Sequence, residues 1–153
     1  MFSRGGIPVL ALAVLATAAC GGGPGAGEPP VTPGAYVDLA QEALQGPSRM
    51  TAIVGRQGGP RPPAAPERMA LDLIVADAER ARERLADAPI EDSGLRAQRD
   101  ALVTRQAAIV GVMRRLVDPL ARGDRATVRA QAPSLVLLMR RLPSDVAAAS
   151  PSS

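Results

Sequence analysis

The chain has 153 residues, a length that suits one domain of ordinary size, and a formal net charge of +3 at pH 7. It contains no His, no Lys and no Trp, and its only aromatic residues are Phe2 and Tyr36. Without His or Lys there is no base to activate a serine nucleophile, and no imidazole for zinc, haem or di-iron sites. Without aromatic rings, sugar and nucleic-acid binding by stacking are disfavoured. We therefore expect a non-enzymatic protein with no metal or cofactor and no nucleic-acid partner.

Residues 1–19 have the three parts of a secretory signal peptide. A short start carries one positive charge, Arg4, an apolar core runs from Ile7 to Ala16, and the small residues 17–19 precede a cleavage point. The apolar core is shorter than the roughly 20 residues that cross a bilayer. The pattern predicts a leader that is removed.

Cys20 is the only cysteine, so it forms no disulfide within the chain. It directly follows Ala18 and Ala19, and this stretch resembles the lipobox of bacterial lipoproteins, with Thr17 where that family most often has Leu. The resemblance implies that Cys20 receives a diacylglycerol and becomes an acylated N-terminus. Two or three acyl chains anchor a protein nearly permanently, because each buried methylene contributes about 0.8 kcal/mol. An ordinary secretory leader and an uncleaved anchor are the alternatives.

The implied location is the bacterial cell envelope, either the outer membrane or the outer face of the cytoplasmic membrane. Gly21 replaces the Asp that retains lipoproteins at the inner membrane in enteric-type envelopes, so sorting to the outer membrane is permitted. Residues 21–34 contain six Gly and four Pro and no apolar periodicity. Such a segment buries too little surface to fold. We therefore predict that residues 20–34 form a flexible tether.

Residues 35–142 are predicted to form the folded domain, and its first half contains two helices. The first helix begins at Ala35 with an apolar side of Tyr36 or Val37, Ala40 and Leu44, and we expect Gly46 and Pro47 to weaken or break it. The Pro-rich segment 58–66 then separates it from a second helix over 66–88, which Pro89 ends. The apolar stripe of the second helix is Ala70, Ile74, Ala78, Ala81 and Leu85.

Two longer helices follow. Asp92 or Ser93 caps a helix that runs to about Arg122, and Gly123 ends it. Asp124 caps the last helix, which Pro143 closes, so residues 143–153 are predicted to be a disordered tail. Pro119 and Pro133 are expected to kink these helices or to shorten them. The stripe of the third helix is Leu95, Leu102, Ile109 and Leu116 with Val112, Met113 and Leu120, and that of the fourth is Val128, Ala132, Leu135, Met139 and Leu142.

Three clear helices and one weaker helix, joined by short turns, predict an all-α fold. Helices connected in this way pack antiparallel, which gives a small up-down-up-down four-helix bundle.

Charge is unevenly distributed along the chain. Residues 20–92 hold seven Arg against eleven acids, whereas residues 93–142 hold ten Arg against three acids. Pairing the last two helices about their turn brings Arg105, Arg140 and Arg141 to one level, with residues 114, 115, 122, 125 and 129 toward the turn. The candidate face for a partner or a membrane is Arg105, Arg114, Arg115, Arg140 and Arg141.

The competing interpretation is internal neutralisation of these arginines by the acidic second helix. That helix carries Asp72, Asp77, Glu79, Glu83 and Asp87. Within it we expect the exposed pairs Arg80 with Glu83 and Arg84 with Asp87.

The functional hypothesis is a membrane-anchored envelope lipoprotein with a non-catalytic binding or scaffolding domain, acting on a protein partner in the envelope. The alternative is a carrier of an apolar small molecule or lipid, which requires a cavity of at least a few hundred Å³ in the core. The oligomeric state is left open.

Overall fold

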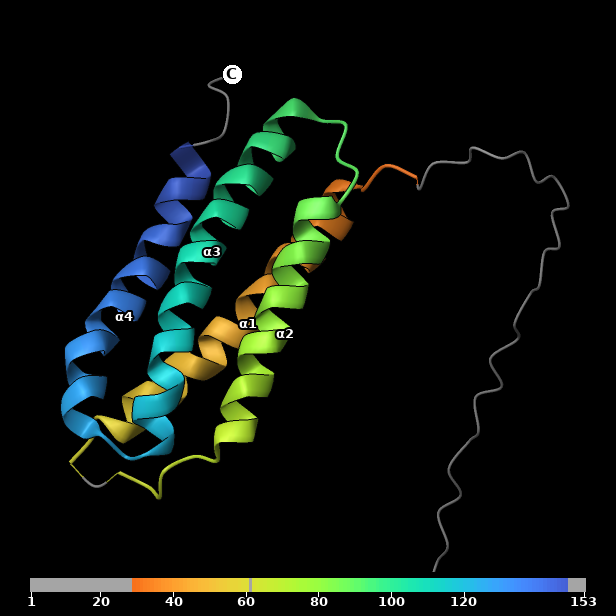
Figure 1. The fold of residues 1–153 in the computed structure, drawn as a ribbon. Coiled ribbons are helices and arrows are strands. Elements are labelled where there is room, and N and C mark those ends of the chain that lie inside the picture. The colour runs from red at the N-terminus through yellow and green to blue at the C-terminus, as the bar shows by residue number, and fades with distance from the viewer. Residues whose placement is uncertain (1–28, 61, 149–153) are drawn as a thin grey trace, which may run out of the picture.

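The computed structural model describes residues 29–60 and 62–148. The described residues form four helices and no strand (Figure 1). The predicted all-α antiparallel bundle is confirmed. The predicted signal peptide, Cys20 and the first part of the tether lie outside the described residues. The helices are α1 (Pro33–Gln57), α2 (Arg68–Asp87), α3 (Ser93–Ala121) and α4 (Arg125–Ala148).

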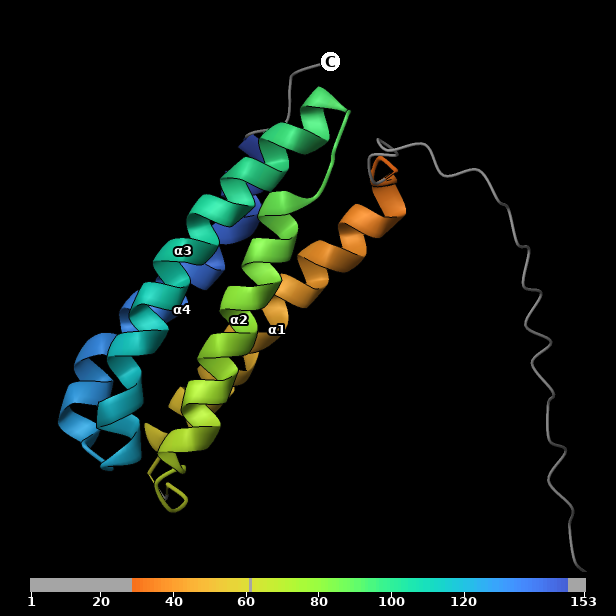
Figure 2. The same cartoon turned by 45° about the vertical axis from the view of Figure 1, so that its right-hand side comes forward.

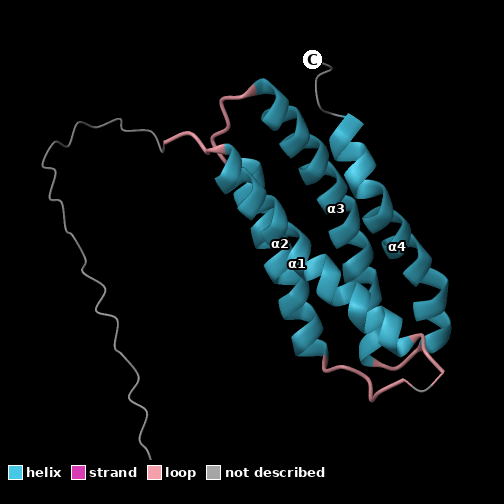
Figure 3. Ribbon diagram, turned by 180° about the vertical axis from the view of Figure 1, so that it is seen from behind, coloured by secondary structure: helices cyan, strands magenta, loops and turns pink. Residues whose placement is uncertain are grey.

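The four helices are not equivalent in the bundle. α2, α3 and α4 lie side by side, and α1 crosses behind them from the C-terminal end of α2 toward the turn between α3 and α4 (Figures 1 and 3). α1 contacts all three other helices, whereas α2 and α4 make no contact among the described residues. Figure 1 shows α3 between α2 and α4, and Figure 2 shows α4 behind α3. The acidic helix and the last basic helix are therefore separated by α3.

Each helix buries one apolar stripe. The stripes predicted for α3 and α4 are confirmed, apart from the half-buried Leu95, Ala132 and Met139. In α2 the predicted Ala78, Ala81 and Leu85 are buried, together with Leu71 and Val75, whereas the predicted Ile74 is half-buried and Ala70 is exposed. The core of α1 consists of Tyr36, Ala43, Met50 and Val54, and the predicted Ala40 and Leu44 are only half-buried.

The predicted break in α1 is wrong, because the helix is continuous from Pro33 to Gln57 with Pro47 inside it. It also begins earlier than predicted. Thr32 caps it by accepting a hydrogen bond from the backbone N–H of Ala35 at 3.3 Å, and Pro33 occupies the first turn, where a missing N–H costs nothing. The backbone N–H of Val31 donates to the carbonyl of Pro89 at 2.8 Å. Residues 31–34 therefore belong to the folded domain rather than to the tether.

A side chain from α3 explains why α1 stays continuous through Pro47. Pro47 has no N–H, so the carbonyl of Ala43, four residues earlier, loses its partner within the helix. The side-chain amide of Gln106 donates to this carbonyl at 2.8 Å, and both residues are fully buried. The hydrogen bond that the proline removes is replaced from another helix, so the buried carbonyl is satisfied.

Gly46 allows α1 and α2 to approach closely. A Cβ atom at position 46 would lie 2.8 Å from the Cβ of Ala78 and 3.2 Å from the carbonyl oxygen of Ile74. Gly55, in the same helix, has nothing within 4 Å of an added Cβ. The glycine that precedes Pro47 therefore serves helix packing and does not end the helix.

The predicted turn between α3 and α4 is confirmed. Gly123 has φ 66°, a conformation that L-residues other than Gly rarely adopt. Asp124 caps α4 by accepting hydrogen bonds from the N–H of Thr127 at 3.1 Å and from its hydroxyl at 2.6 Å. Neither Pro119 nor Pro133 shortens its helix.

The predicted end of the last helix at Pro143 is wrong, because α4 continues to Ala148. A proline removes its own N–H from the hydrogen-bond ladder, and the two alanines that end α4 are the best helix formers. Residues 143–148 are therefore helical rather than part of a disordered tail.

The cap at Asp124 makes stability depend on pH. The Thr127 hydroxyl and then the Thr127 N–H hold the pKa of Asp124 below its ordinary value of 3.8. Because the folded pKa is lowered, the contribution is complete above the ordinary value and is lost as the pH falls through the lowered one. We expect the advantage of the wild type over Asp124→Asn in urea unfolding to shrink below pH 3.8. An advantage that is the same at all pH values would contradict this role.

Candidate interaction surface

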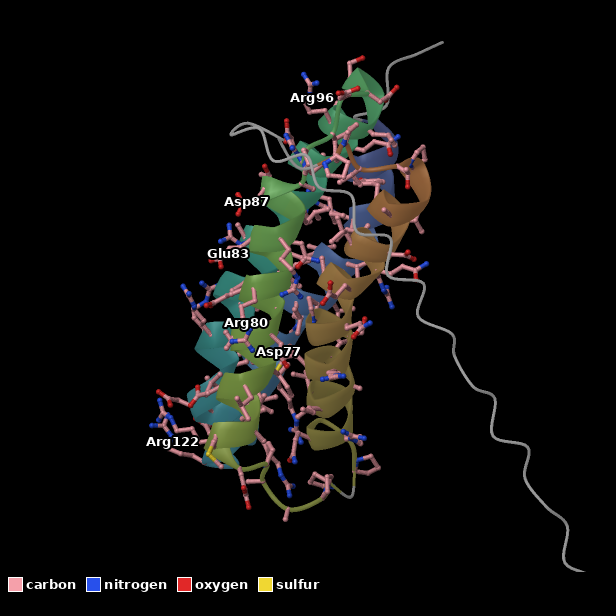
Figure 4. The ribbon with its side chains drawn as sticks, turned by 90° about the vertical axis from the view of Figure 1, so that its right-hand side faces the viewer. Asp77, Arg80, Glu83, Asp87, Arg96 and Arg122 are labelled. Carbon is pink, nitrogen blue, oxygen red and sulfur yellow. The ribbon has the colours of Figure 1, made fainter. Side chains whose placement is uncertain are left out.

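α2 forms ion pairs within the helix and with the neighbouring helices α1 and α3. Figure 4 shows Asp77, Arg80, Glu83 and Asp87 following one another along α2. Arg80 pairs with Asp77, and Arg84 pairs with Glu42 of α1. The predicted pairs of Arg80 with Glu83 and Arg84 with Asp87 are therefore wrong, because other carboxylates lie closer.

An acid of α2 neutralises one of the five arginines of the predicted face. Arg114 of α3 contacts Glu79 of α2, with Nε at 2.7 Å and Nη2 at 2.5 Å from the same carboxylate oxygen. A second pair across these two helices joins Arg68 to Asp118 at 2.7 Å. Both pairs are largely exposed, so each contributes about 1 kcal/mol or less. Arg114 is thus directed toward α2.

The five predicted arginines do not form one face. Arg105 and Arg114 are nine residues apart on α3, which places them about 180° apart around the helix. Arg105 is half-buried and makes an interaction of its own, whereas Arg115 is exposed. Arg140 and Arg141 are exposed on α4 and have no ion pair with a side chain before residue 143 in the described chain. The structure therefore does not bring Arg105 and Arg114 to one face.

The outer side of α4 forms a continuous exposed row. Every fourth residue from 125 to 141 is exposed, and residues four apart lie next to one another along a helix surface. Arg140 is exposed three residues after Leu137, which is 49 % exposed. We name this surface the arginine ridge. It consists of Arg125, Arg129, Pro133, Leu137 and Arg141, with Arg140 beside them.

The arginine ridge has few counter-charges on its own helix, where Asp145, four residues after Arg141, is the single acid. Residues 125–142 contain four Arg and no acid. None of the four has an ion pair with a side chain of residues 29–60 or 62–142. The acids of α2 are out of reach, because α2 and α4 make no contact in the described part of the chain. Arg140 and Arg141 belong to the face predicted from the sequence, whereas Arg125 and Arg129 do not. The four-residue spacing from Arg125 to Arg141 is nevertheless visible in the sequence.

The end of the bundle where the described chain begins is held by arginines of α3. Arg99 donates to the carbonyl of Ala88 at 3.0 Å, and Arg96 donates to those of Ile90 and Glu91 at 3.2 and 2.9 Å. These bonds satisfy the carbonyls of the loop between α2 and α3. Figure 4 places Arg96 at this end and Arg122 at the other.

Tyr36 is buried at the same end of the bundle. Burial raises the pKa of its hydroxyl, and the nearby charge of Arg99 partly opposes the increase. An open hollow of about 530 Å³ lies beside it on the surface, between the start of α1 and the start of α3. The hollow is lined by residues 30–33, Glu91, Asp92 and Leu95.

Three further hollows flank α2. They have volumes of about 240, 250 and 200 Å³ and are lined mainly by charged side chains of α1, α2 and α3. None of these hollows is lined by the core stripes of α3 and α4, where the carrier hypothesis places its ligand. That hypothesis stays a prediction.

Comparison with known proteins gives no relatives. No family model, no curated protein and no solved structure matches the chain. Within residues 29–60 and 62–148, no helix is long and apolar enough to span a membrane. The same residues bring together no group of three or more His, Cys, Asp or Glu side chains suited to a metal ion.

Proposed function

We propose that the protein is a lipoprotein of the bacterial cell envelope, anchored through acyl chains on Cys20, whose helical domain is a non-catalytic binding module. The arginine ridge carries the binding part of this proposal. It combines four arginines with the single acid Asp145 on one helix, so its net positive charge suits a negatively charged partner. The absence of His and Lys from the whole chain supports a module that binds without catalysing a reaction.

The anchor is supported by the sequence. Cys20 follows a leader of the secretory type, and residues 17–20 resemble a lipobox. The first described residue is Pro29, nine positions after Cys20, so a short segment joins the anchor to the folded domain. An anchor in this position would hold the binding module at a membrane surface.

The anchor is tested by producing the full chain in a bacterium that processes lipoproteins. We expect the wild type in the membrane fraction, released by detergent but not by high salt, with an intact mass equal to residues 20–153 plus acyl chains. Cys20→Ser should appear without acyl chains and should leave the membrane fraction. A soluble wild type with an unmodified thiol would refute the proposal.

A further inference from the structure

The arginine ridge has the shape and the charge of a surface that lies on a lipid headgroup layer. It is the convex outer side of a single helix, and α4 lines none of the four hollows described above. Protein partners bind best to pockets that bury an anchor residue, whereas a flat lipid surface needs no pocket. The convex shape therefore favours a lipid surface over a protein.

The composition of the ridge is that of an interfacial helix. Leu137 lies four residues before Arg141 and eight after Arg129, so arginines flank an exposed apolar side chain on the same row. An apolar residue can enter the headgroup layer while neighbouring arginines stay with the phosphates. Each arginine near an anionic surface contributes about a fivefold gain in binding.

The charge of the whole domain orients it. The acids of α2 lie beyond α3 from the arginine ridge, since α2 and α4 make no contact within the described residues. An anionic surface therefore attracts the α4 side more strongly than the α2 side, where four arginines stand against five acids within α2. The domain has one preferred face toward such a surface.

The proposed anchor lies within reach of the ridge. Figure 1 shows the start of α1 and the end of α4 at the same end of the bundle. The twelve residues from Cys20 to Val31 span at most about 40 Å. The ridge from Arg125 to Arg141 is about 24 Å long. The anchor can therefore sit in the membrane while the whole ridge rests on it.

From these observations we infer that the arginine ridge of α4 binds the anionic lipid surface of the membrane that holds Cys20. The inference rests on the proposed function, because it names the partner of the surface assigned there. Binding of the ridge would place α4 along the membrane surface, with α2 on the side of the domain that faces away from the membrane. The acyl anchor keeps the domain next to the lipid surface and makes binding of the ridge an intramolecular step, so a few arginines suffice for binding.

The test uses the acylated full chain with a polarity-sensitive fluorophore at position 137. Since Cys20 is the only cysteine and is blocked by acylation, Leu137→Cys provides one free thiol. The protein is reconstituted into vesicles of phosphatidylcholine alone or mixed with phosphatidylglycerol. On anionic vesicles at low salt we expect a blue-shifted emission and a several-fold lower quenching by acrylamide, and high salt should reverse both. On neutral vesicles the fluorophore should stay accessible.

Matched controls separate the ridge from the rest of the surface. A fluorophore introduced by Leu73→Cys, 56 % exposed on α2, should be equally accessible on both kinds of vesicle. Arg140→Gln with Arg141→Gln should lower the ratio of shielded to accessible probe about 30-fold. Arg49→Gln with Arg56→Gln removes the same charge from exposed positions of α1 and should leave that ratio unchanged. Circular dichroism checks that each variant is folded.

The outcomes distinguish the two proposals. A probe at position 137 that stays accessible on anionic vesicles overturns the inference, while flotation of the protein with both kinds of vesicle still supports the anchor. Shielding that occurs only in native envelopes assigns the ridge to a protein and also overturns the inference. A protein that floats with neither vesicle and carries a free thiol at Cys20 refutes the proposed function itself.

Discussion

Replacement of Gln106 by leucine is expected to lower the free energy of unfolding by about 1 to 3 kcal/mol, although leucine is apolar and suits a core. The side-chain amide of Gln106 is the donor that reaches the carbonyl of Ala43, at 2.8 Å. Leucine leaves that buried carbonyl without a partner, because Pro47 has no N–H to offer. The measurement is urea unfolding followed by circular dichroism.

The control is a double-mutant cycle with Pro47→Ala. An alanine at position 47 supplies the missing N–H, so the carbonyl of Ala43 is satisfied within α1 whether or not Gln106 is present. The cost of Gln106→Leu should therefore vanish or change sign in the Pro47→Ala background. In that background Gln106→Leu can become stabilising, because it removes the buried Oε1 atom of Gln106, which has no hydrogen-bond partner among the described residues. Equal costs in both backgrounds would show that Gln106 acts by packing alone.

This hydrogen bond explains why sequence reasoning failed in α1 and succeeded elsewhere. Gly46 and Pro47 in succession favour a break when only neighbouring residues are considered. The residue that repairs the helix is 63 positions away, so no local rule contains it. By contrast, the caps at Asp92 and Asp124 act within three residues, so Asp124 was predicted correctly and Asp92 was one of two predicted candidates.

The arginine excess could be predicted from the sequence, but the neutralisation of individual arginines could not, because it depends on contacts between helices. The excess of arginine after residue 93 is a property of composition and was readable at once. Which arginines are neutralised depends on which helices touch. Arg114 reaches Glu79 because α2 and α3 are adjacent, whereas Arg140 and Arg141 are far from those acids because α2 and α4 are not in contact within the described chain.

One part of the surface was readable and was missed. Nine residues separate Arg105 from Arg114, and the helical period alone places them on opposite sides of α3. The four-residue steps from Arg125 to Arg141 place those residues on one row for the same reason. Pairing helices by level along the hairpin was insufficient, because it ignored the direction in which each side chain leaves its helix.

Gly46→Ala is expected to destabilise the bundle by about 1 to 3 kcal/mol, even though alanine is the better helix former by about 1 kcal/mol. The added Cβ would lie 2.8 Å from the Cβ of Ala78 and 3.2 Å from the backbone oxygen of Ile74. Neither atom belongs to a flexible side chain, so α1 and α2 must move apart along a fully packed contact. Thermal or urea unfolding measures the loss.

Gly55→Ala is the matched control in the same helix, and the opposite sign is expected. An added Cβ at position 55 meets nothing within 4 Å, so the variant should gain about 0.5 to 1 kcal/mol from helix propensity. Ala78→Gly should partly rescue Gly46→Ala, because it removes the nearer of the two clashing atoms and leaves the carbonyl of Ile74. If both glycine variants are stabilised alike, α1 and α2 are not in close contact at position 46. The position of α1 across the other three helices, and with it the separation of α2 from the arginine ridge, would then be in error.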